Sequence, residues 1–376
     1  MTMIGTLGQA WRGRVTPWGD VEVPGAPPLA WFVAADDRWH RPAQETSTRQ
    51  RRVGGAPVVE TKLRVPGGSV VHTAWCSADR GGMTYVMVRN DSPLPIAVAF
   101  SRGDLWLPRP PTDVPIEGIE LPAGSVVLPV GHAASAVVGV AHRGSPPPPG
   151  GPAPAVEPVI NGWRTLAERA SRLTLADPGA ADDVVARRCD VALDSPGADD
   201  ESVLVAAGEV ARMGLTDRVD PVEIAAGVER LLRSGRTDWS VRAALRGARL
   251  ALATVDESRA VDDLRRAVRA RSWAAAPADR PDGVLGVPWT EQRLVADDAT
   301  LFPSGFARDW LGVPLEAHGV AVDAASVSFG IRWHGARPAV LWEITGGPVT
   351  LTSAAAPGWS STLARGEALW PAPGDV

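Results

Sequence analysis

A segment rich in proline and glycine, GSPPPPGGPAPAV at residues 144–156, divides the sequence into parts with different patterns. Proline has no backbone N–H and favours the extended polyproline II conformation, so its run of four prolines excludes a helix. Runs typical of strands precede the segment, and runs typical of helices follow it. We therefore expect a linker at 144–156 that ends a first domain of residues 1–143.

The first domain is expected to be an antiparallel β-sandwich. Short runs rich in β-branched residues recur between Gly and Pro turn signals, which is typical of strands in this architecture. The stretch DDRWHRPAQETSTRQRR at 36–52 interrupts them and is expected to be an exposed loop. The expected strands are 29–35, 56–65, 68–76, 83–90, 95–101, 124–131 and 135–142.

Residues 157–272 are expected to form antiparallel helical hairpins with about six helices. The best-delimited helix covers DPVEIAAGVERLLRSG, where Asp220 is a candidate N-cap and Pro221 stands at the first helical position. Glu223 has capping-box spacing, and Gly235 predicts the end of the helix. The first helix is expected from an apolar stripe made of Val159, Trp163, Leu166, Ala170 and Leu173.

Residues 273–376 are expected to form a small C-terminal β-sandwich module, which makes the fold class α+β multidomain. VSFGIRWHGARPAVLWEITGG predicts a hairpin with a turn at 335–338, a core face, and a polar face where Arg332 and Glu343 lie on a diagonal. The expected register pairs Trp333 with Val340, Ile331 with Trp342 and Phe329 with Ile344.

The net charge of −5 and the pI near 5.8 give no basic field for nucleic acid or an anionic membrane. No apolar run approaches the ~18 residues of a membrane span, and MTMIGTLGQAWRGRV lacks a secretory apolar region. Cys76 and Cys189 are isolated, which favours buried thiols in a reducing compartment. We expect a cytoplasmic protein, and the near absence of lysine indicates a GC-rich genome.

No metal site or cofactor is expected. The six histidines occur singly, without HExxH or paired-His spacing. The nucleophile elbow GxSxG, the phosphate loop GxxxxGK[ST] and the dinucleotide motif GxGxxG do not occur. The Arg-rich stretch ESRAVDDLRRAVRARS has interleaved acids and is expected to be a solvated helix face.

Three segments resemble the six-hairpin glycosidase superfamily, which includes glucoamylases, disaccharide phosphorylases and debranching-type glucosidases. Residues 88–101 are similar to a strand pair of the N-terminal sandwich, and 205–232 to a helical hairpin. Residues 327–352 are similar to the C-terminal hairpin that follows the barrel. The resemblance implies a carbohydrate context. It transfers no catalytic residue, because about six helices make only half of such a barrel.

Two glutamates are candidate catalytic carboxylates, because glycoside hydrolysis uses a pair of them. Glu209 lies on an otherwise small and apolar helix, where loss of water would raise its pKa. Glu291 stands beside Trp289 in an expected loop, and this pair suits a sugar subsite. The alternatives are an exposed helix position for Glu209 and a plain surface loop for Glu291.

The 36–52 stretch is the other candidate site, because loops on rigid sandwiches often carry binding function. Its acids and aromatic rings could bind hydroxyls and stack on a sugar, and its arginines could hold a phosphate. The alternative is a solvated charged loop or a subunit contact. The candidates are Asp36, Asp37, Arg38, Trp39, His40, Glu45, Arg49, Arg51 and Arg52, with Trp289 from the C-terminal part.

The 15 tryptophans, against one tyrosine and five phenylalanines, suggest either core filling or stacking on sugar rings. The leading hypothesis is a carbohydrate-binding relative of six-hairpin glycosidases without hydrolase activity. A second is an active compact glycoside hydrolase or phosphorylase that uses Glu209 or Glu291. A third is an assembly protein whose helices present a groove to a protein partner or to a second copy of the chain.

Overall fold

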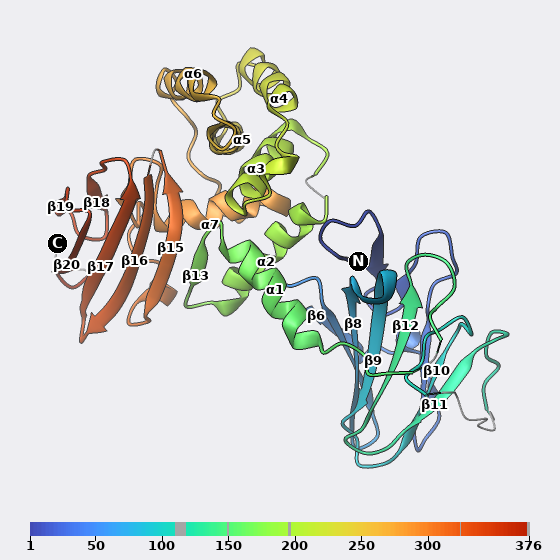
Figure 1. Ribbon diagram of the computed structural model, residues 1–376. Coiled ribbons are helices and arrows are strands. Elements are labelled where there is room, and N and C mark those ends of the chain that lie inside the picture. Colours follow the sequence, from blue (N-terminus) through green and yellow to red (C-terminus); the bar gives the residue numbers. More distant parts are fainter. Residues whose placement is uncertain (110–117, 149, 195–196, 324, 374–376) are drawn as a thin grey trace. The chain divides into compact units, whose positions relative to one another are not determined.

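The computed structural model describes residues 1–109, 118–148, 150–194, 197–323 and 325–373. The chain divides into two compact units, Met1–Trp163 and Arg164–Val376. The boundary lies within helix α1 (Val156–Glu168), which begins at the end of the expected linker. The helices and the C-terminal sheets therefore belong to one unit. The α+β fold class predicted from the sequence is confirmed (Figure 1).

The first unit contains antiparallel sheets of four and five strands, in the orders β11-β10-β4-β5 and β12-β9-β8-β7-β6, and a small sheet β1-β2-β3. All seven strands expected here are present. The strands are β1 (Thr2–Gly5), β2 (Arg12–Val15), β3 (Val21–Glu22), β4 (Trp31–Ala34), β5 (Trp39–His40), β6 (Arg49–Arg52), β7 (Val59–Val65), β8 (Gly68–Ser77), β9 (Met83–Asn90), β10 (Ile96–Phe100), β11 (Val126–Val130) and β12 (Ser135–Ala141).

Both large sheets of the first unit contribute to one apolar core. Val33, Val98 and Phe100 come from the four-stranded sheet, and Val70 and Val88 from the five-stranded sheet. Inward-facing side chains that share one core are what two stacked sheets require. The N-terminal β-sandwich is thus present.

Segment 36–52 was wrongly expected to be one exposed loop. It contains β5, which pairs with β4, and β6, which pairs with β7. The physical reason is that strand pairing satisfies the backbone hydrogen bonds of a charged segment, while every second side chain can still point toward water. The charged composition therefore gave no sequence signal for these two edge strands.

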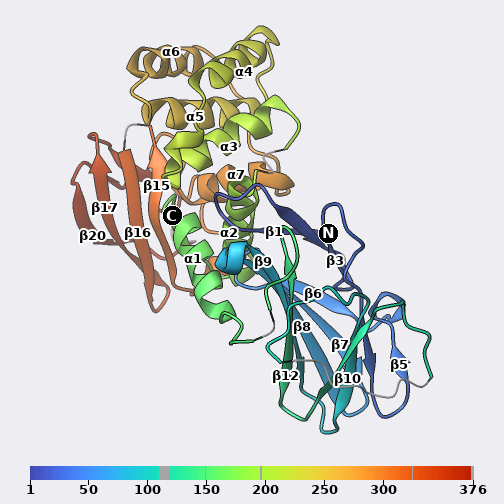
Figure 2. The same ribbon diagram turned by 45° about the vertical axis from the view of Figure 1, so that its right-hand side comes forward.

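The second unit continues with helices that agree with the helical hairpins expected from the sequence. Figures 1 and 2 show α5 between α3 and α6. The helices are α2 (Pro178–Ala192), α3 (Asp200–Arg212), α4 (Pro221–Arg233), α5 (Trp239–Ala253), α6 (Ser258–Arg269) and α7 (Gly286–Leu294). In α4 the predicted N-cap is confirmed, because the Asp220 carboxylate accepts from the backbone N–H groups of Val222 and Glu223.

Helices α3 and α5 approach closely at two glycines. A Cβ on Gly208 would lie 2.7 Å from the Cα of Gly247. A Cβ on Gly247 would lie 2.7 Å from the Cα of Val205 and would also strike the carbonyl oxygen of Leu204. The contacts are backbone atoms, which cannot move aside as a flexible side chain can. These glycines therefore set the distance between the two helices.

Two secondary-structure expectations in this unit were wrong. Leu173 was assigned to the first helix but lies in strand β13 (Arg172–Thr174), which pairs with β15. The segment that carries Trp289 and Glu291 was expected to be a loop but forms α7. A three-residue strand leaves too short a pattern to detect, and α7 lacks a capping side chain at its N-terminus.

The C-terminal part contains sheets β13-β15-β16-β17-β20 and β14-β18-β19. Leu301 and Leu351 from the smaller sheet share a core with Phe329, Ile331 and Val340 from the larger one, as expected for a small β-sandwich. The strands are β14 (Thr300–Leu301), β15 (Leu315–Val322), β16 (Ala325–His334), β17 (Arg337–Gly346), β18 (Leu351–Ser353), β19 (Ser360–Ser361) and β20 (Arg365–Leu369).

The β16–β17 hairpin is present, but its register was predicted two residues out. Its turn is the two-residue Gly335–Ala336, so Ile331 pairs with Val340 rather than with Trp342. Gly335 has φ +62°, which a tight hairpin turn requires and which glycine adopts without strain. A shift of two residues preserves the faces, and the predicted core face is confirmed.

The expected diagonal between Arg332 and Glu343 does not form. Arg332 lies 3.6 Å from Glu316, and Glu343 lies 2.7 Å from Arg365. The register shift moves the two side chains apart along the hairpin, and neighbouring strands supply closer partners.

In the part of the chain that the structure describes, no helix has both the length and the apolar character needed to cross a membrane.

Candidate functional site

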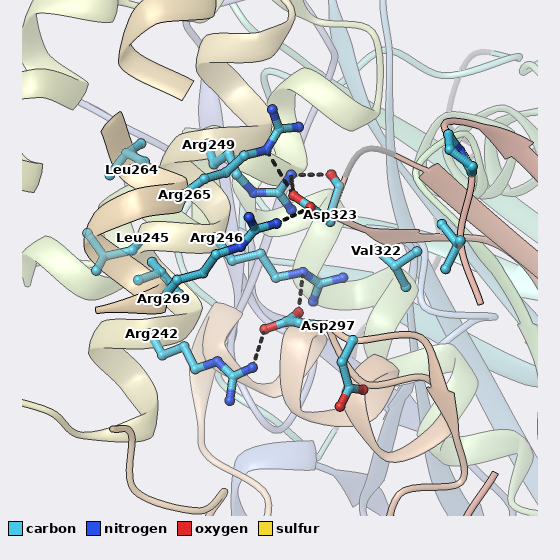
Figure 3. A pocket seen from close by; sticks show the side chains of 14 residues that line it. Arg242, Leu245, Arg246, Arg249, Leu264, Arg265, Arg269, Asp297, Val322 and Asp323 are labelled. Carbon is cyan, nitrogen blue, oxygen red and sulfur yellow. Dashed lines mark hydrogen bonds and ion pairs between the residues drawn. The ribbon is translucent and has the colours of Figure 1, made fainter. Parts of the chain in front are cut away.

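A pocket of about 380 Å³ lies in the second unit, between helices α5 and α6 and the C-terminal strands. Among the described residues, five arginines and three aspartates line it, which leaves an excess of two positive charges. We call it the arginine pocket (Figure 3). Its charged residues are Arg242, Arg246, Arg249, Arg265, Arg269, Asp297, Asp298 and Asp323.

Helix periodicity brings these arginines together. Positions 242, 246 and 249 of α5 have the spacing i, i+4 and i+7, and positions 265 and 269 of α6 have the spacing i and i+4. Residues at these spacings share one face of a helix. Leu245 and Leu264 are apolar parts of the wall. The two helices thus present their arginine faces to the same space.

One group of arginines surrounds Asp323, which follows β15. Its Oδ1 lies 2.9 Å from Nε of Arg265 and 3.3 Å from Nη1 of Arg249, and its Oδ2 lies 3.2 Å from Nη2 of Arg269. Arg249 also donates to the carbonyl oxygen of Asp323. We call Arg249, Arg265 and Arg269 the arginine triad. A single carboxylate faces three guanidinium groups in this part of the pocket (Figure 3).

The other arginines of the pocket face Asp297. Its Oδ2 lies 3.1 Å from Nη2 of Arg242, and its Oδ1 lies 3.2 Å from Nε of Arg246. The second contact is an ion pair without hydrogen-bond geometry. Within the described residues, the buried Nε groups of both arginines have no hydrogen-bond partner. A buried N–H without an acceptor is costly, so the positive charge of this pair of arginines is incompletely satisfied by hydrogen bonds.

The pocket lowers the pKa of Arg249 to about 10. Burial is the main cause, and the positive charge of Arg246 is the next, while Asp323 acts in the opposite direction. The guanidinium remains charged at neutral pH. A lowered pKa on an arginine means that its charge is incompletely compensated, which is a favourable condition for an added anion.

The structure brings the two candidate catalytic carboxylates together, around two buried arginines. Arg188 lies 2.6 Å from Glu209 and 2.7 Å from Glu291, and Arg212 lies 2.7 Å from each. Ser171 donates to Glu291 over 2.6 Å. We call these five residues the buried charge cluster. Glu209 is therefore buried. This excludes the alternative that it occupies an exposed helix position.

Burial alone would raise the pKa of Glu291, but the charges of Arg212, Arg188 and Arg246 outweigh it and hold this pKa far below its usual range. A glycosidase acid needs a raised pKa so that it carries a proton at working pH. Glu291 instead stays ionised and forms ion pairs. Neither glutamate is among the described residues that line the arginine pocket.

The candidates on segment 36–52 bind one another. Nε2 of His40 lies 2.9 Å from Oδ1 of Asp37, and Nδ1 lies 3.1 Å from Oε1 of Glu45. Arg38 lies 2.8 Å from the same Glu45 oxygen. The hydrogen bond from His40 lowers the pKa of Asp37, and Arg38, followed by His40, lowers that of Glu45. His40 is buried, so this group folds the segment onto itself.

Arg49, Arg51 and Trp289 have other partners. Arg49 donates to the carbonyl oxygens of Thr46 and Thr48, and Arg51 lies 2.9 Å from Glu60. Trp289 belongs to the second unit, where it donates to the carbonyl oxygen of Pro277 and the Arg293 guanidinium lies 4.8 Å from its ring centroid. Trp289 is buried against these neighbours.

None of the 15 tryptophans, all of which lie in described parts of the chain, is exposed. Nine of them are buried, and Trp31, Trp106 and Trp370 are exposed by 1% or less. Core filling therefore accounts for the tryptophan excess. The excess gives no support to stacking on sugar rings.

Sequence reasoning missed the arginine pocket. The stretch that forms α6 was interpreted as a solvated face. This holds for Arg266 and Arg269, whose side chains are both 74% exposed, but not for Arg265, and Arg265 and Arg269 contact Asp323 in the pocket. A usable signal was the helical spacing of arginines 242, 246 and 249 within an otherwise apolar stretch.

In the described residues, no group of three or more His, Cys, Asp or Glu side chains could hold a metal ion.

The chain was compared with known protein families, curated proteins and solved structures, and it matches none of them. The geometry of the chain itself must therefore carry the functional argument.

Proposed function

We propose that this protein binds a small organic anion in the arginine pocket. The observation that carries the proposal is the excess of arginine over aspartate among the described residues that line the pocket. An anionic ligand would neutralise the excess charge and accept hydrogen bonds from the guanidinium groups that line the pocket. The volume of about 380 Å³ is in the usual range for small-molecule sites, and Leu245 and Leu264 offer apolar contact.

The ligand we propose is derived from a carbohydrate, bound by a relative of the six-hairpin glycosidases. The order of sandwich, helical hairpins and C-terminal sandwich supports this part of the proposal. The role is binding rather than hydrolysis, because Glu209 and Glu291 are held in ion pairs and Glu291 has a lowered pKa. A catalytic acid would have to donate a proton that Glu291 does not carry.

Replacing Arg269 by glutamine is expected to weaken anion binding by about five- to tenfold, because one charge-assisted contact is lost. The matched control is Arg266→Gln. Both arginines lie on α6 with 74% of their side chains exposed, but Arg266 pairs with Asp263 and does not line the pocket. Titration calorimetry with glucuronate and with glucose 6-phosphate measures both variants.

The proposal predicts weaker binding for Arg269→Gln and an unchanged affinity for Arg266→Gln. Equal losses in the two variants would show that only the overall charge of the protein matters. If neither anion bound to the unaltered protein at millimolar concentration, the result would contradict the proposed function.

A further inference from the structure

The unneutralised charge of the arginine pocket is concentrated at the arginine triad. Arg242 and Arg246 have Asp297 between them, and Arg246 also lies 3.7 Å from Glu291, so these two arginines have two carboxylates nearby. Among the described pocket residues, Asp323 is the carboxylate that contacts the three arginines of the triad. Arg265 is also 3.0 Å from Asp262, whose side chain is 60% exposed and therefore screened by water.

The Asp323 carboxylate marks where an anion sits. Its two oxygens are shared among three guanidinium groups at 2.9 to 3.3 Å, so each arginine keeps N–H donors that this carboxylate does not use. Its side chain is 41% exposed, and it follows the last residue of β15, where water can solvate a displaced carboxylate. If a ligand displaced the Asp323 carboxylate, that carboxylate would move into water and would not become a buried charge.

A phosphate monoester fits this site better than a second carboxylate. It carries a charge of about −1.5 to −2 at neutral pH and has three acceptor oxygens, one for each arginine of the triad. A ligand carboxylate has two oxygens and one charge, so it would only replace Asp323 without a gain. Toward the rest of the pocket, the Asp297 carboxylate offers an acceptor for hydroxyl groups.

We infer that the ligand is the phosphate monoester of a hydroxyl-bearing compound, whose phosphoryl group binds Arg249, Arg265 and Arg269 in place of the Asp323 carboxylate. The inference rests on the proposed function and adds the chemical class of the ligand. It also gives Asp323 a role as a built-in competitor for the site. Removal of the competing charge must then tighten binding.

The test uses titration calorimetry of the full chain with three compounds that share one sugar ring. Glucose 6-phosphate is a dianion above about pH 7, glucuronate carries a single charge, and glucose is neutral. We expect glucose 6-phosphate to bind at least about tenfold more tightly than glucuronate, and glucose to bind most weakly. Asp323→Asn should tighten the binding of glucose 6-phosphate by about tenfold.

Asp298→Asn is the matched control, because it removes one negative charge from the same pocket. Asp298 accepts a hydrogen bond from the Thr300 backbone N–H, and its carboxylate contacts no arginine of the triad in the described structure. We expect it to change the affinity much less than Asp323→Asn. Melting temperatures of both variants verify that they are folded.

The outcomes separate the two proposals. If glucuronate binds as tightly as glucose 6-phosphate and Asp323→Asn has no larger effect than Asp298→Asn, the phosphate inference is overturned while anion binding stands. If neither anion binds to the unaltered protein or to a folded Asp323→Asn variant, the proposed function fails, and the inference fails with it.

Discussion

Replacement of Glu291 by glutamine is expected to lower the free energy of unfolding by about 3–5 kcal/mol. Glu291 is fully buried and is the common partner of Arg188 and Arg212. An amide of the same shape keeps the volume but removes the charge, so Glu209 alone must compensate two buried guanidinium groups. For a unit of this size, calorimetry should record a melting temperature lower by roughly 10 °C.

Glu343→Gln is the control for this experiment. Glu343 lies 2.7 Å from Arg365, but their side chains are 52% and 79% exposed, so water already screens the pair. We expect its melting temperature to be unchanged within error. A Glu291→Gln variant as stable as Glu343→Gln would contradict the structural importance of the buried charge cluster.

The same cluster predicts how stability depends on pH. The folded-state pKa of Glu291 lies below its unfolded value, so the unfolded chain takes up this proton first. The contribution of Glu291 is therefore complete above the ordinary glutamate pKa of about 4.3 and decreases as the pH falls toward the folded pKa. Glu291→Gln should flatten the decline of stability below about pH 5.

Replacement of Gly247 by alanine is the second large expected effect. Alanine raises helix propensity by about 1 kcal/mol, but its Cβ would collide with the backbone of α3 at Leu204 and Val205. Overpacking of this kind costs about 1–3 kcal/mol, and backbone atoms have no alternative rotamer to relieve it. We expect a lower melting temperature and, because α5 carries Arg246 and Arg249, weaker anion binding.

Gly162→Ala is the matched control, because Gly162 is also helical but a Cβ there would meet no atom within 4 Å among the described residues. It should stabilise the protein by about 0.5–1 kcal/mol. The two variants are thus expected to shift the melting temperature in opposite directions. A rise with Gly247→Ala would contradict the close approach of α3 and α5.

The fold was predictable where the signal is local. Runs rich in β-branched residues between turn signals located β7, β8 and β9, and the Asp220 cap located the start of α4, because the residues involved are neighbours in sequence. The hairpin register failed because moving the two-residue turn by one position, from 336–337 to 335–336, shifts the cross-strand pairs by two residues and leaves the same side chains on each face.

The candidate site was less predictable, because its contacts are between distant residues. Sequence selected Glu209 as a carboxylate on an apolar helix and Glu291 as the neighbour of Trp289, but their arginine partners include one 103 positions away from Glu291. Helical spacing shows that arginines 242, 246 and 249 share a face. It does not show that Asp297 and Asp323 lie opposite that face, far along the chain.

The most direct test of anion binding in the arginine pocket is a crystal structure of the protein soaked with glucose 6-phosphate, from crystals grown without phosphate or sulfate. We expect the phosphoryl oxygens within about 2.7–3.2 Å of the guanidinium groups of Arg249, Arg265 and Arg269, with the Asp323 carboxylate displaced toward solvent. A pocket without ligand at saturating concentration, or a ligand bound only elsewhere, would contradict the account.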